Sequence, residues 1–513
     1  MAAASLFGHV CLRADAGAAA GTGHLMRCLA LAEAWQDRGG TASFVTATAV
    51  PALLQRLGSE GFAAHRLQAE PASAADAAES LVAASSSDAT WIVVDGYPFG
   101  PGYLKALRDS GLQLLVVDDL AAQDLASAHL IVNPNVQATP ELYAGTTGRV
   151  LAGSAFALLR REFQAGDAGL GRAAVRPGSD PANRVVITMG GSDPPNATGR
   201  ILEILSGYHD RRLKLSVILG PANPHLKKLE VAASALRRTH AVELLVDPPD
   251  LPAVLSRAEL AITAAGTGCW ELASLGVPLA LVVVADNQRA GAAALAAQDL
   301  AVLLGWHGEL DDSAVLQQLA PLLNNSELRR RMSADARALI DGRGACRVAE
   351  RMAAYPLQLR SATVADAHLL YEWANDPLTR RMSFSSEPIP WGIHVEWLAR
   401  RLADPDCRLF VAANQDGLAV GQVRLDRDGP GATLSFSLAP AARGQGLAAR
   451  LVRLAAVDSL MAGWCQAVDA WVRLENIPSA AAFRRAGFTE REAPPELNEP
   501  RWSQGGALLF SLS

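Results

Sequence analysis

Short apolar runs alternate with helical patterns along the first third of the chain. Residues 9–13 predict a strand, and the amphipathic stretch that follows predicts a helix over residues 24–38 that ends at Gly39-Gly40. Further strands are predicted over residues 41–46, 91–95, 112–118 and 130–133. Strands that alternate with helices predict a parallel sheet with crossover helices.

The alternation restarts after a segment rich in Gly, Pro and Asp near residues 166–183. Residues 185–189 predict a strand that runs directly into Gly190-Gly191-Ser192-Asp193, and strands over 214–219, 242–245, 260–263 and 279–284 continue the series. Two Rossmann-like halves of similar size leave a cleft, and ligands bind beyond the carboxyl ends of such strands. We therefore expect an α/β fold with two Rossmann-like domains, over residues 1–165 and 166–350, that flank a cleft.

A different pattern begins near residue 356. Three runs at 408–414, 419–426 and 432–438 predict an antiparallel meander after a strand at 357–362 and a helix at 364–375. A helix at 446–461, a strand at 467–472 and a helix at 479–486 follow, and the charged helical stretch 328–354 would connect this part to the rest. We expect an α+β domain over residues 356–513.

Composition limits the classes of protein that this chain represents. With 513 residues it exceeds one hydrophobic core, and its net charge of −6 without blocks of like charge gives no basic footprint for nucleic acid. Six scattered cysteines without a C-x-x-C pair are typical of reduced thiols. No apolar run reaches 18 residues and no signal peptide begins the chain, so we expect a cytoplasmic protein without a membrane segment.

The most informative segment is Gly21-Thr22-Gly23-His24, directly before a predicted helix. The glycines permit a tight turn, and the free N–H groups of a helix start suit phosphate. An imidazole at the mouth of the cleft is suited to general-base catalysis near neutral pH. The alternative is a helix-capping histidine without chemistry.

Motifs in a fixed order connect this segment to a known family. Arg13-Ala14-Asp15 followed by Gly-x-Gly-His-x-x-Arg resembles the beginning of the UDP-2,4-diacetamido-2,4,6-trideoxy-β-L-altropyranose hydrolases of the pseudaminic acid pathway. The resemblance spans roughly residues 5–350. It continues through Asp95-Gly96-Tyr97, Val132-Asn133-Pro134-Asn135, residues 153–163, Met189-Gly190-Gly191-Ser192-Asp193, residues 265–271 and Asp286-Asn287-Gln288.

The resemblance implies the two-Rossmann architecture of glycosyltransferase-B type and inverting hydrolysis at the anomeric carbon, with C–O cleavage and without a metal. It implies that His24 activates water, that Tyr97 lines the sugar site and that Glu271 accepts hydrogen bonds from the ribose hydroxyls. Gly96 departs from relatives that carry a histidine there. UDP leaves readily once backbone N–H groups and a helix dipole hold its charge. The further substrate-binding residues implied are Arg13, Asp15, Gly23, Arg27, Gly190, Gly191, Thr267, Asn287 and Gln288.

A second glycine-rich turn lies between a predicted strand and a predicted helix, at Arg443-Gly444-Gln445-Gly446-Leu447-Ala448 after Leu438. Its successive N–H groups suit a pyrophosphate, although an ordinary helix start gives the same pattern. Arg-Gly-x-Gly-x-Ala matches the acetyl-CoA loop of the GNAT N-acetyltransferases. Asn476, Ser479, Phe483 and Gly487-Phe488 resemble the late GNAT segment, in which an Asn and a Ser line the CoA arm. Residues 357–513 are thereby identified as a GNAT domain that binds acetyl-CoA.

The proton chemistry of this second domain stays open. Many GNAT enzymes carry a tyrosine as general acid where this chain has Phe483, so that thiolate protonation falls to water, Ser479 or another group, or else Phe483 only packs. Glu372, Glu396 and His394 are candidate bases for the acceptor amine, each with a structural alternative.

The two motif sets imply consecutive steps, because acetylation of the 4-amino group precedes UDP release in that pathway. We expect a bifunctional enzyme that N-acetylates a UDP-amino sugar with acetyl-CoA and hydrolyses the product with water. The alternatives are a UDP-sugar glycosyltransferase fused to an acetyltransferase, the same two steps on another 2,4-diamino sugar, or a non-enzymatic nucleotide-sugar sensor.

Overall fold

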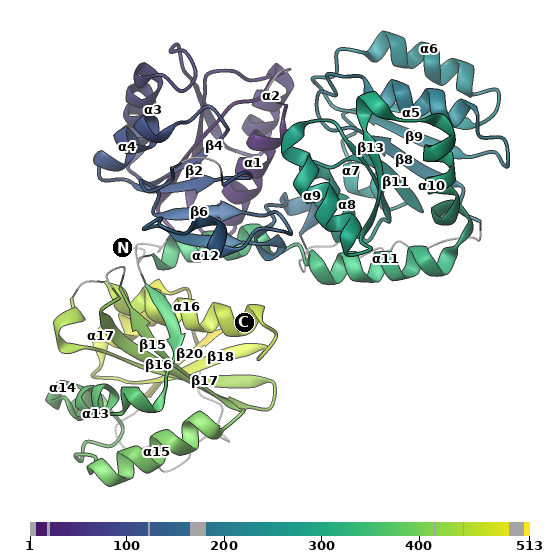
Figure 1. Cartoon of the computed structure of the whole chain (residues 1–513). Helices are drawn as coiled ribbons and strands as arrows, with labels where there is room; N and C mark the ends of the chain where they lie inside the picture. Colours follow the sequence, from purple (N-terminus) through teal and green to yellow (C-terminus); the bar gives the residue numbers. More distant parts are fainter. Residues whose placement is uncertain are drawn as a thin grey trace. The chain divides into compact units, whose positions relative to one another are not determined.

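The computed structural model describes residues 7–17, 21–121, 124–164, 181–355, 357–414, 417–444, 446–491 and 507–513. It divides into two compact units, His9–Ala349 and Glu350–Ser513, and Phe7 and Gly8 belong to the second (Figure 1). The predicted boundary between residues 165 and 166 lies outside the described residues.

The first half of the unit His9–Ala349 is a seven-stranded, wholly parallel sheet in the order β3-β2-β1-β4-β5-β6-β7. The sheet order reverses between β1 and β4, which is the point where ligands bind in doubly wound sheets. Helix α1 lies on one side of the sheet, and α3 and α4 lie on the other (Figure 1). The strands are β1 (His9–Ala14), β2 (Thr41–Thr46), β3 (Ala63–Arg66), β4 (Ala89–Asp95), β5 (Gln113–Val117), β6 (Leu130–Asn133) and β7 (Arg149–Ala152). The helices are α1 (Gly23–Gln36), α2 (Pro51–Ser59), α3 (Ala74–Ser86) and α4 (Pro101–Asp109).

The second half is a six-stranded parallel sheet in the order β10-β9-β8-β11-β12-β13, with its reversal between β8 and β11. The strands are β8 (Arg184–Thr188), β9 (Lys214–Leu219), β10 (Ala241–Val246), β11 (Leu260–Ala264), β12 (Leu279–Val283) and β13 (Ala301–Trp306). The helices are α5 (Ala197–Ser206), α6 (Leu226–Leu236), α7 (Leu251–Leu255), α8 (Thr267–Leu275), α9 (Arg289–Ala297), α10 (Asp312–Asn324) and α11 (Ser326–Leu339). Helix α12 (Gly344–Ala354) begins in this unit and continues past its last residue, Ala349.

The central strands of both sheets are buried on both faces, which explains their continuous apolar runs. The prediction missed β3, β7 and β13. Strand β3 reads Ala-Ala-His-Arg and is exposed throughout, so it carries no hydrophobic signal. Strand β7 has only four residues, and Gly305 with a register irregularity interrupts the pairing of β13.

The unit Glu350–Ser513 contains a mixed sheet in the order β14-β15-β16-β17-β18-β20-β19. All described pairings are antiparallel except that of β17 with β18. The strands are β14 (Gln358–Ser361), β15 (Cys407–Ala413), β16 (Ala419–Asp428), β17 (Gly431–Leu438), β18 (Ala467–Arg473), β19 (Thr489–Arg491) and β20 (Ala507–Leu512). The helices are α13 (Ala367–Asn375), α14 (Pro377–Met382), α15 (Trp391–Ala403), α16 (Leu447–Met461) and α17 (Ile477–Arg485).

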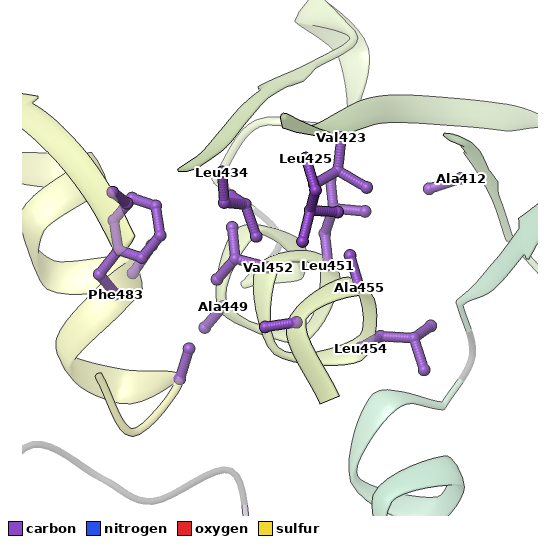
Figure 2. Packing of buried hydrophobic residues seen from close by; sticks show 14 of the residues in the cluster. Ala412, Val423, Leu425, Leu434, Ala449, Leu451, Val452, Leu454, Ala455 and Phe483 are labelled. Carbon is purple, nitrogen blue, oxygen red and sulfur yellow. The ribbon is translucent and has the colours of Figure 1, made fainter. Parts of the chain in front are cut away.

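Helix α16 supplies the centre of the core of this unit. Figure 2 shows Leu451 and Val452 of α16 facing Leu425 and Leu434 of the meander. All four side chains are buried, and each removes apolar surface from water. The sheet topologies confirm the expected fold class: two Rossmann-like parallel sheets followed by an α+β domain.

Candidate functional site

A cavity of about 790 Å³ lies at the carboxyl ends of the two parallel sheets, and we call it the cleft site. It is lined by both halves of the unit His9–Ala349. Ten of the predicted residues line it: Gly23, His24, Arg27, Tyr97, Gly190, Gly191, Thr267, Glu271, Asn287 and Gln288. The reversal points β1/β4 and β8/β11 therefore bring together motifs that are far apart in sequence.

His24 is in the first turn of α1, and its imidazole is held by Asp95 at the end of β4. The distance from Nδ1 of His24 to Oδ1 of Asp95 is 2.6 Å, and the carboxylate is fully buried. A carboxylate at Nδ1 fixes the tautomer and leaves the lone pair of a neutral imidazole on Nε2. Because β1 and β4 are neighbours in the sheet, residues separated by 71 positions form this pair.

Arg27, one turn further along α1, connects two carboxylates behind the imidazole. Its guanidinium donates to Asp95 through Nε (2.9 Å) and Nη2 (2.7 Å), and Nη1 donates to Asp119 (2.6 Å). Burial alone would raise the pKa of Asp119, but Arg27 outweighs it and lowers that pKa, so Asp119 is ionised. The Arg27 guanidinium therefore joins the carboxylate that contacts His24 to the carboxylate of Asp119.

The Tyr97 hydroxyl connects the two halves of the cleft site. It donates to Oδ2 of Asp119 (2.8 Å) and accepts from Nδ2 of Asn287 (2.6 Å). The ring meets His24 edge to face, with centroids 4.9 Å apart. Partial burial and the nearby Asp119 raise the pKa of Tyr97, so the hydroxyl stays a donor. A Cβ on Gly96 would lie 2.8 Å from the Phe99 ring, which is too close for a histidine here unless the ring shifts. The polar side chain that contacts the Tyr97 hydroxyl in this half of the cleft is Asp119.

Glycines bring backbone groups of the two halves close together across the cleft. A Cβ on Gly191 would collide with Thr22, and a Cβ on Gly23 would lie 3.3 Å from Oγ1 of Thr267. Helices α1 and α8 both begin here without a side-chain cap. Their first N–H groups are therefore available to an anion.

Helix α5 differs, because its first turn is already satisfied. Asp193 accepts hydrogen bonds from the backbone N–H groups of Ala197 and Thr198. Gln288 has a supporting position in the second half of the cleft: its Oε1 accepts from the N–H of Val284, and its Nε2 faces Gly266.

Glu271 lies on α8 and is mostly buried. Its Oε1 accepts from Nε (3.0 Å) and Nη2 (2.8 Å) of Arg160. Burial raises the pKa of Glu271, and Arg160 opposes that shift. In the described part of the chain Oε2 has no partner, so it can accept hydrogen bonds from ligand hydroxyl groups.

Arg13 and Asp15, which the resemblance implied as substrate-binding, do not line the cleft site. The Arg13 guanidinium is fully buried and forms two hydrogen bonds with Asp76 and one with Asp15. Asp15 also accepts from the N–H groups of Ala47 and Thr48, so the pair ties together the loops after β1 and β2. Asp95, Asp119 and Arg160, which contact His24, Arg27 and Glu271, were not among the predicted site residues.

The predicted acetyl-CoA turn of the second unit begins where two strands separate. β17 and β18 pair in parallel only from Gly431–Ala467 to Thr433–Asp469, and β17 then continues to Leu438. Gly444 and Gly446 have φ of +79° and +72°, which other residues rarely adopt. Helix α16 begins at Leu447 without a side-chain cap, so its first N–H groups are available to an anion such as a pyrophosphate. Gln445 lies outside the described residues.

Arg443 is already engaged by protein groups. Its Nη2 donates to Oδ1 of Asp376 (2.6 Å) and to Oγ1 of Thr379 (3.0 Å). This bond attaches the glycine turn to the start of α14. The guanidinium charge is therefore partly neutralised before any phosphate binds.

The late GNAT residues have structural roles in addition to their predicted ones. Asn476 caps α17 by accepting from the N–H of Ser479. Phe483 is buried and packs against Phe436, Phe488 and Phe510, in agreement with the alternative that it only packs. Figure 2 shows its ring beside the α16 core.

The candidate bases of this unit separate by burial. His394 is buried, bonds the carbonyl of Ala367 through Nε2, and has a pKa lowered by burial. It therefore ties α15 to α13. Glu372 and Glu396 are exposed.

Two family models match parts of the chain. Residues 185–344 match the glycosyltransferase family 28 C-terminal domain, and residues 357–489 match the acetyltransferase (GNAT) domain. The chain therefore joins a glycosyltransferase-28-like domain to a GNAT acetyltransferase domain.

Individual relatives are distant. The spore coat polysaccharide biosynthesis protein SpsG of Bacillus subtilis is 26% identical over 165 residues, which cover 32% of this chain and 48% of that protein. The uncharacterized protein MJ1062 of Methanocaldococcus jannaschii is 21% identical over 357 residues, covering 66% of this chain and 69% of that protein.

Among solved structures, Acinetobacter baumannii MurG is 17% identical with a TM-score of 0.48, covering 67% of this chain and 98% of that one. Spermidine N-acetyltransferase from Vibrio cholerae, in complex with CoA and spermine, is 20% identical with a TM-score of 0.27, covering 31% of this chain and 95% of that one.

The described residues contain no group of three or more His, Cys, Asp or Glu side chains arranged to hold a metal ion. None of the helices in that part of the chain has the length and apolar composition of a membrane-spanning segment.

Proposed function

We propose that the cleft site hydrolyses a UDP-linked, acetylated amino sugar and that the GNAT domain installs the acetyl group. The observation that carries the proposal is the His24–Asp95 pair at the mouth of a cleft where two helices begin without side-chain caps. UDP-2,4-diacetamido-2,4,6-trideoxy-β-L-altropyranose is the substrate that the sequence resemblance favours.

In the proposed hydrolysis a water oxygen forms a bond to the anomeric carbon while the bond from that carbon to the phosphate oxygen breaks. Nε2 of His24 takes the proton of the water, and Asp95 stabilises the imidazolium that results. The UDP oxygen leaves with the electron pair. The N–H groups of α1 and α8 and the Gly190-Gly191 turn hold the diphosphate, and Oε2 of Glu271 accepts from the ribose hydroxyls.

In the proposed acetyl transfer the neutral 4-amino group attacks the thioester carbonyl of acetyl-CoA. The new C–N bond forms as the C–S bond breaks, and the thiolate receives the proton that the amine loses. The turn at Gly444 and Gly446 and the start of α16 would hold the pyrophosphate of the cofactor.

A second candidate for the cleft site is glycosyl transfer to an acceptor other than water. The match of residues 185–344 to a glycosyltransferase domain favours it, as does the resemblance to a polysaccharide biosynthesis protein. The same fold serves both reactions, so only the acceptor distinguishes them.

The test supplies the purified chain with acetyl-CoA and a panel of UDP-4-amino sugars that differ in configuration, with no acceptor but water. We expect CoA thiol release followed by UDP and free diacetamido sugar, fastest for the altro configuration. UDP that appears only after an acceptor is added would overturn hydrolysis in favour of glycosyl transfer. Tight binding of UDP-sugars without turnover of any kind would revive the sensor alternative.

A further inference from the structure

A second cavity, of about 540 Å³, lies in the unit Glu350–Ser513, and we call it the arginine pocket. Its wall includes Arg380 and Arg381 from α14 and Arg473 from the end of β18, together with Asn375 and Pro388. No acidic side chain lines it among the described residues.

The positive charge of the arginine pocket is only partly compensated. Arg380 donates to the carbonyls of Ala374 and Ser385 and to the Ser383 hydroxyl, none of which is anionic. Burial without a carboxylate beside it lowers the pKa of Arg380. An exposed carboxylate, Glu475, pairs with Arg473, and no ion pair engages Arg381 within the described residues. The pocket therefore favours an anion.

The wall of the arginine pocket is fixed by hydrogen bonds from neighbouring elements. Asn375 donates to the carbonyl of Ile389 (3.1 Å) and accepts from its N–H (2.7 Å), which holds the segment after α14. Asp376 caps α14 and accepts from Arg443 of the glycine turn. Because these hydrogen bonds fix the backbone that carries the guanidinium groups, the arginine side chains lose little conformational freedom when they bind phosphate.

The location of the arginine pocket connects it to acetyl transfer. Arg473 is the last residue of β18, beyond the point where β17 and β18 stop pairing. The Arg443–Asp376 bond attaches α14 to the turn that fits the pyrophosphate of acetyl-CoA. A ligand in the arginine pocket therefore lies next to the opening between the two strands.

We propose that the arginine pocket binds the diphosphate of the nucleotide-linked amino sugar that the acetyltransferase acetylates. This inference rests on the proposed function, because it takes the amine acceptor of the GNAT domain to be the nucleotide-linked sugar. A polycationic amine would be repelled by Arg380 and Arg381, which no carboxylate pairs within the described residues. The glycine turn holds the pyrophosphate of the cofactor, so the two diphosphates have separate sites.

The first test follows acetyl transfer by CoA thiol release in the full-length chain. Arg381→Ala should raise the KM of the UDP-linked acceptor about 10-fold and leave the KM of acetyl-CoA unchanged, and Arg381→Lys should restore much of the loss. The free amino sugar, which lacks phosphate, should react poorly and equally with all variants. Arg400→Ala, which removes an exposed arginine on α15 outside the pocket, is the matched control. An unchanged KM for the UDP-linked acceptor, or a raised KM for acetyl-CoA instead, would overturn the inference.

Hydrogen exchange with UDP as the probe gives a readout that needs no turnover. UDP should slow exchange in residues 377–390 as well as in the first turns of α1 and α8, and Arg381→Ala should abolish only the first effect. Protection of α1 and α8 without protection of 377–390 sinks this inference and spares the proposed function. Protection of residues 377–390 in a chain that never releases UDP from a UDP-sugar would support this inference and contradict the proposed hydrolysis.

Discussion

At the residue scale, the proposed hydrolysis depends on the contacts of the His24 imidazole. His24 contacts Asp95 through Nδ1, and Arg27 joins that carboxylate to Asp119. A carboxylate in this position orients the ring and stabilises its protonated form during the reaction. The same position in the sequence without Asp95 would be an ordinary histidine at a helix start.

Replacing Asp95 with asparagine tests this role. Asp95→Asn keeps the shape of the side chain but removes the charge that stabilises the imidazolium, so kcat for UDP release should fall by about 10²- to 10⁴-fold. Acetyl transfer, measured by CoA thiol release, should not change. The control Asp109→Asn removes an exposed carboxylate paired only with Lys105 and should leave both rates intact. Equal loss of both activities in Asp95→Asn would indicate misfolding instead of a catalytic defect.

Tyr97 offers a second test, because its hydroxyl joins Asp119 to Asn287 across the cleft. Tyr97→Phe keeps the ring beside His24 but loses both hydrogen bonds. We expect the KM for the UDP-sugar to rise roughly 3- to 10-fold, corresponding to about 1 kcal/mol. Asn287→Ala should have a similar effect, and the double variant should be no worse than either single one. Strict additivity of the two effects would contradict a shared interaction.

At the element scale, α1 carries His24 in its first turn and a buried acid, Glu33, near its other end. Glu33 accepts a hydrogen bond of 2.5 Å from the N–H of Arg161, the first residue of the short 3-10 turn Arg161–Phe163. Burial raises the pKa of Glu33 to about 7 from an ordinary value of 4.5. The neighbouring Arg160 reaches Glu271, so this bond also positions one wall of the cleft site.

The raised pKa of Glu33 predicts a pH dependence of stability. Between pH 4.5 and 7 the folded chain holds a proton that the unfolded chain has lost, so the free energy of unfolding falls as pH rises through this window. Glu33→Gln keeps an acceptor for Arg161 and removes this loss, so at pH 8 it should be more stable than the parent by at most about 3 kcal/mol. Urea unfolding at pH 5 and pH 8 measures it, with the exposed Glu230→Gln as control. A Glu33→Gln variant that shows the same pH dependence as the parent contradicts the assignment.

Strands were predicted well where the strand is buried, because a buried strand requires a run of apolar residues. Strands β2, β6 and β9 match their predicted bounds. Each has a neighbouring strand on both sides, and an interior strand of a parallel sheet that helices cover carries apolar side chains on both faces. Strand β3 escaped prediction because an exposed edge strand needs none. Neither β19 nor β20 was predicted, since β20 pairs with β18 and β19 pairs with β20, and these pairings depend on the tertiary arrangement of the sheet.

The cleft site was predicted in part for a related reason. Gly-x-Gly-His is a local signal that made His24 a candidate, and the resemblance to a known family supplied the prediction that it activates water. Asp95 and Asp119 lie at or just after the ends of β4 and β5, which marks them as candidates near a ligand, but their contact with Arg27 depends on the sheet order. Arg13 shows the opposite error: it belongs to a motif, yet its partners Asp76 and Asp15 give it a structural role.

At the scale of the whole molecule, two compact units carry two different kinds of site. The unit His9–Ala349 holds a cleft lined by residues of α1 and α8, His24 among them, and the unit Glu350–Ser513 holds a glycine turn beside an arginine pocket. Separate cores let each site be altered without the other. The proposed reactions are consecutive, since the acetylated product of one is the substrate of the other.

The most direct test of the two proposed reactions measures CoA release and UDP release by the His24→Ala chain. Supplied with acetyl-CoA and the UDP-4-amino sugar, this variant should release CoA at the parent rate and accumulate the acetylated UDP-sugar, detected by mass spectrometry, with no UDP formed. The control His209→Ala, an exposed histidine outside the cleft, should convert the same substrate fully to UDP and free sugar. UDP release by His24→Ala at the parent rate would contradict the central claim, and so would the loss of both activities in a folded protein.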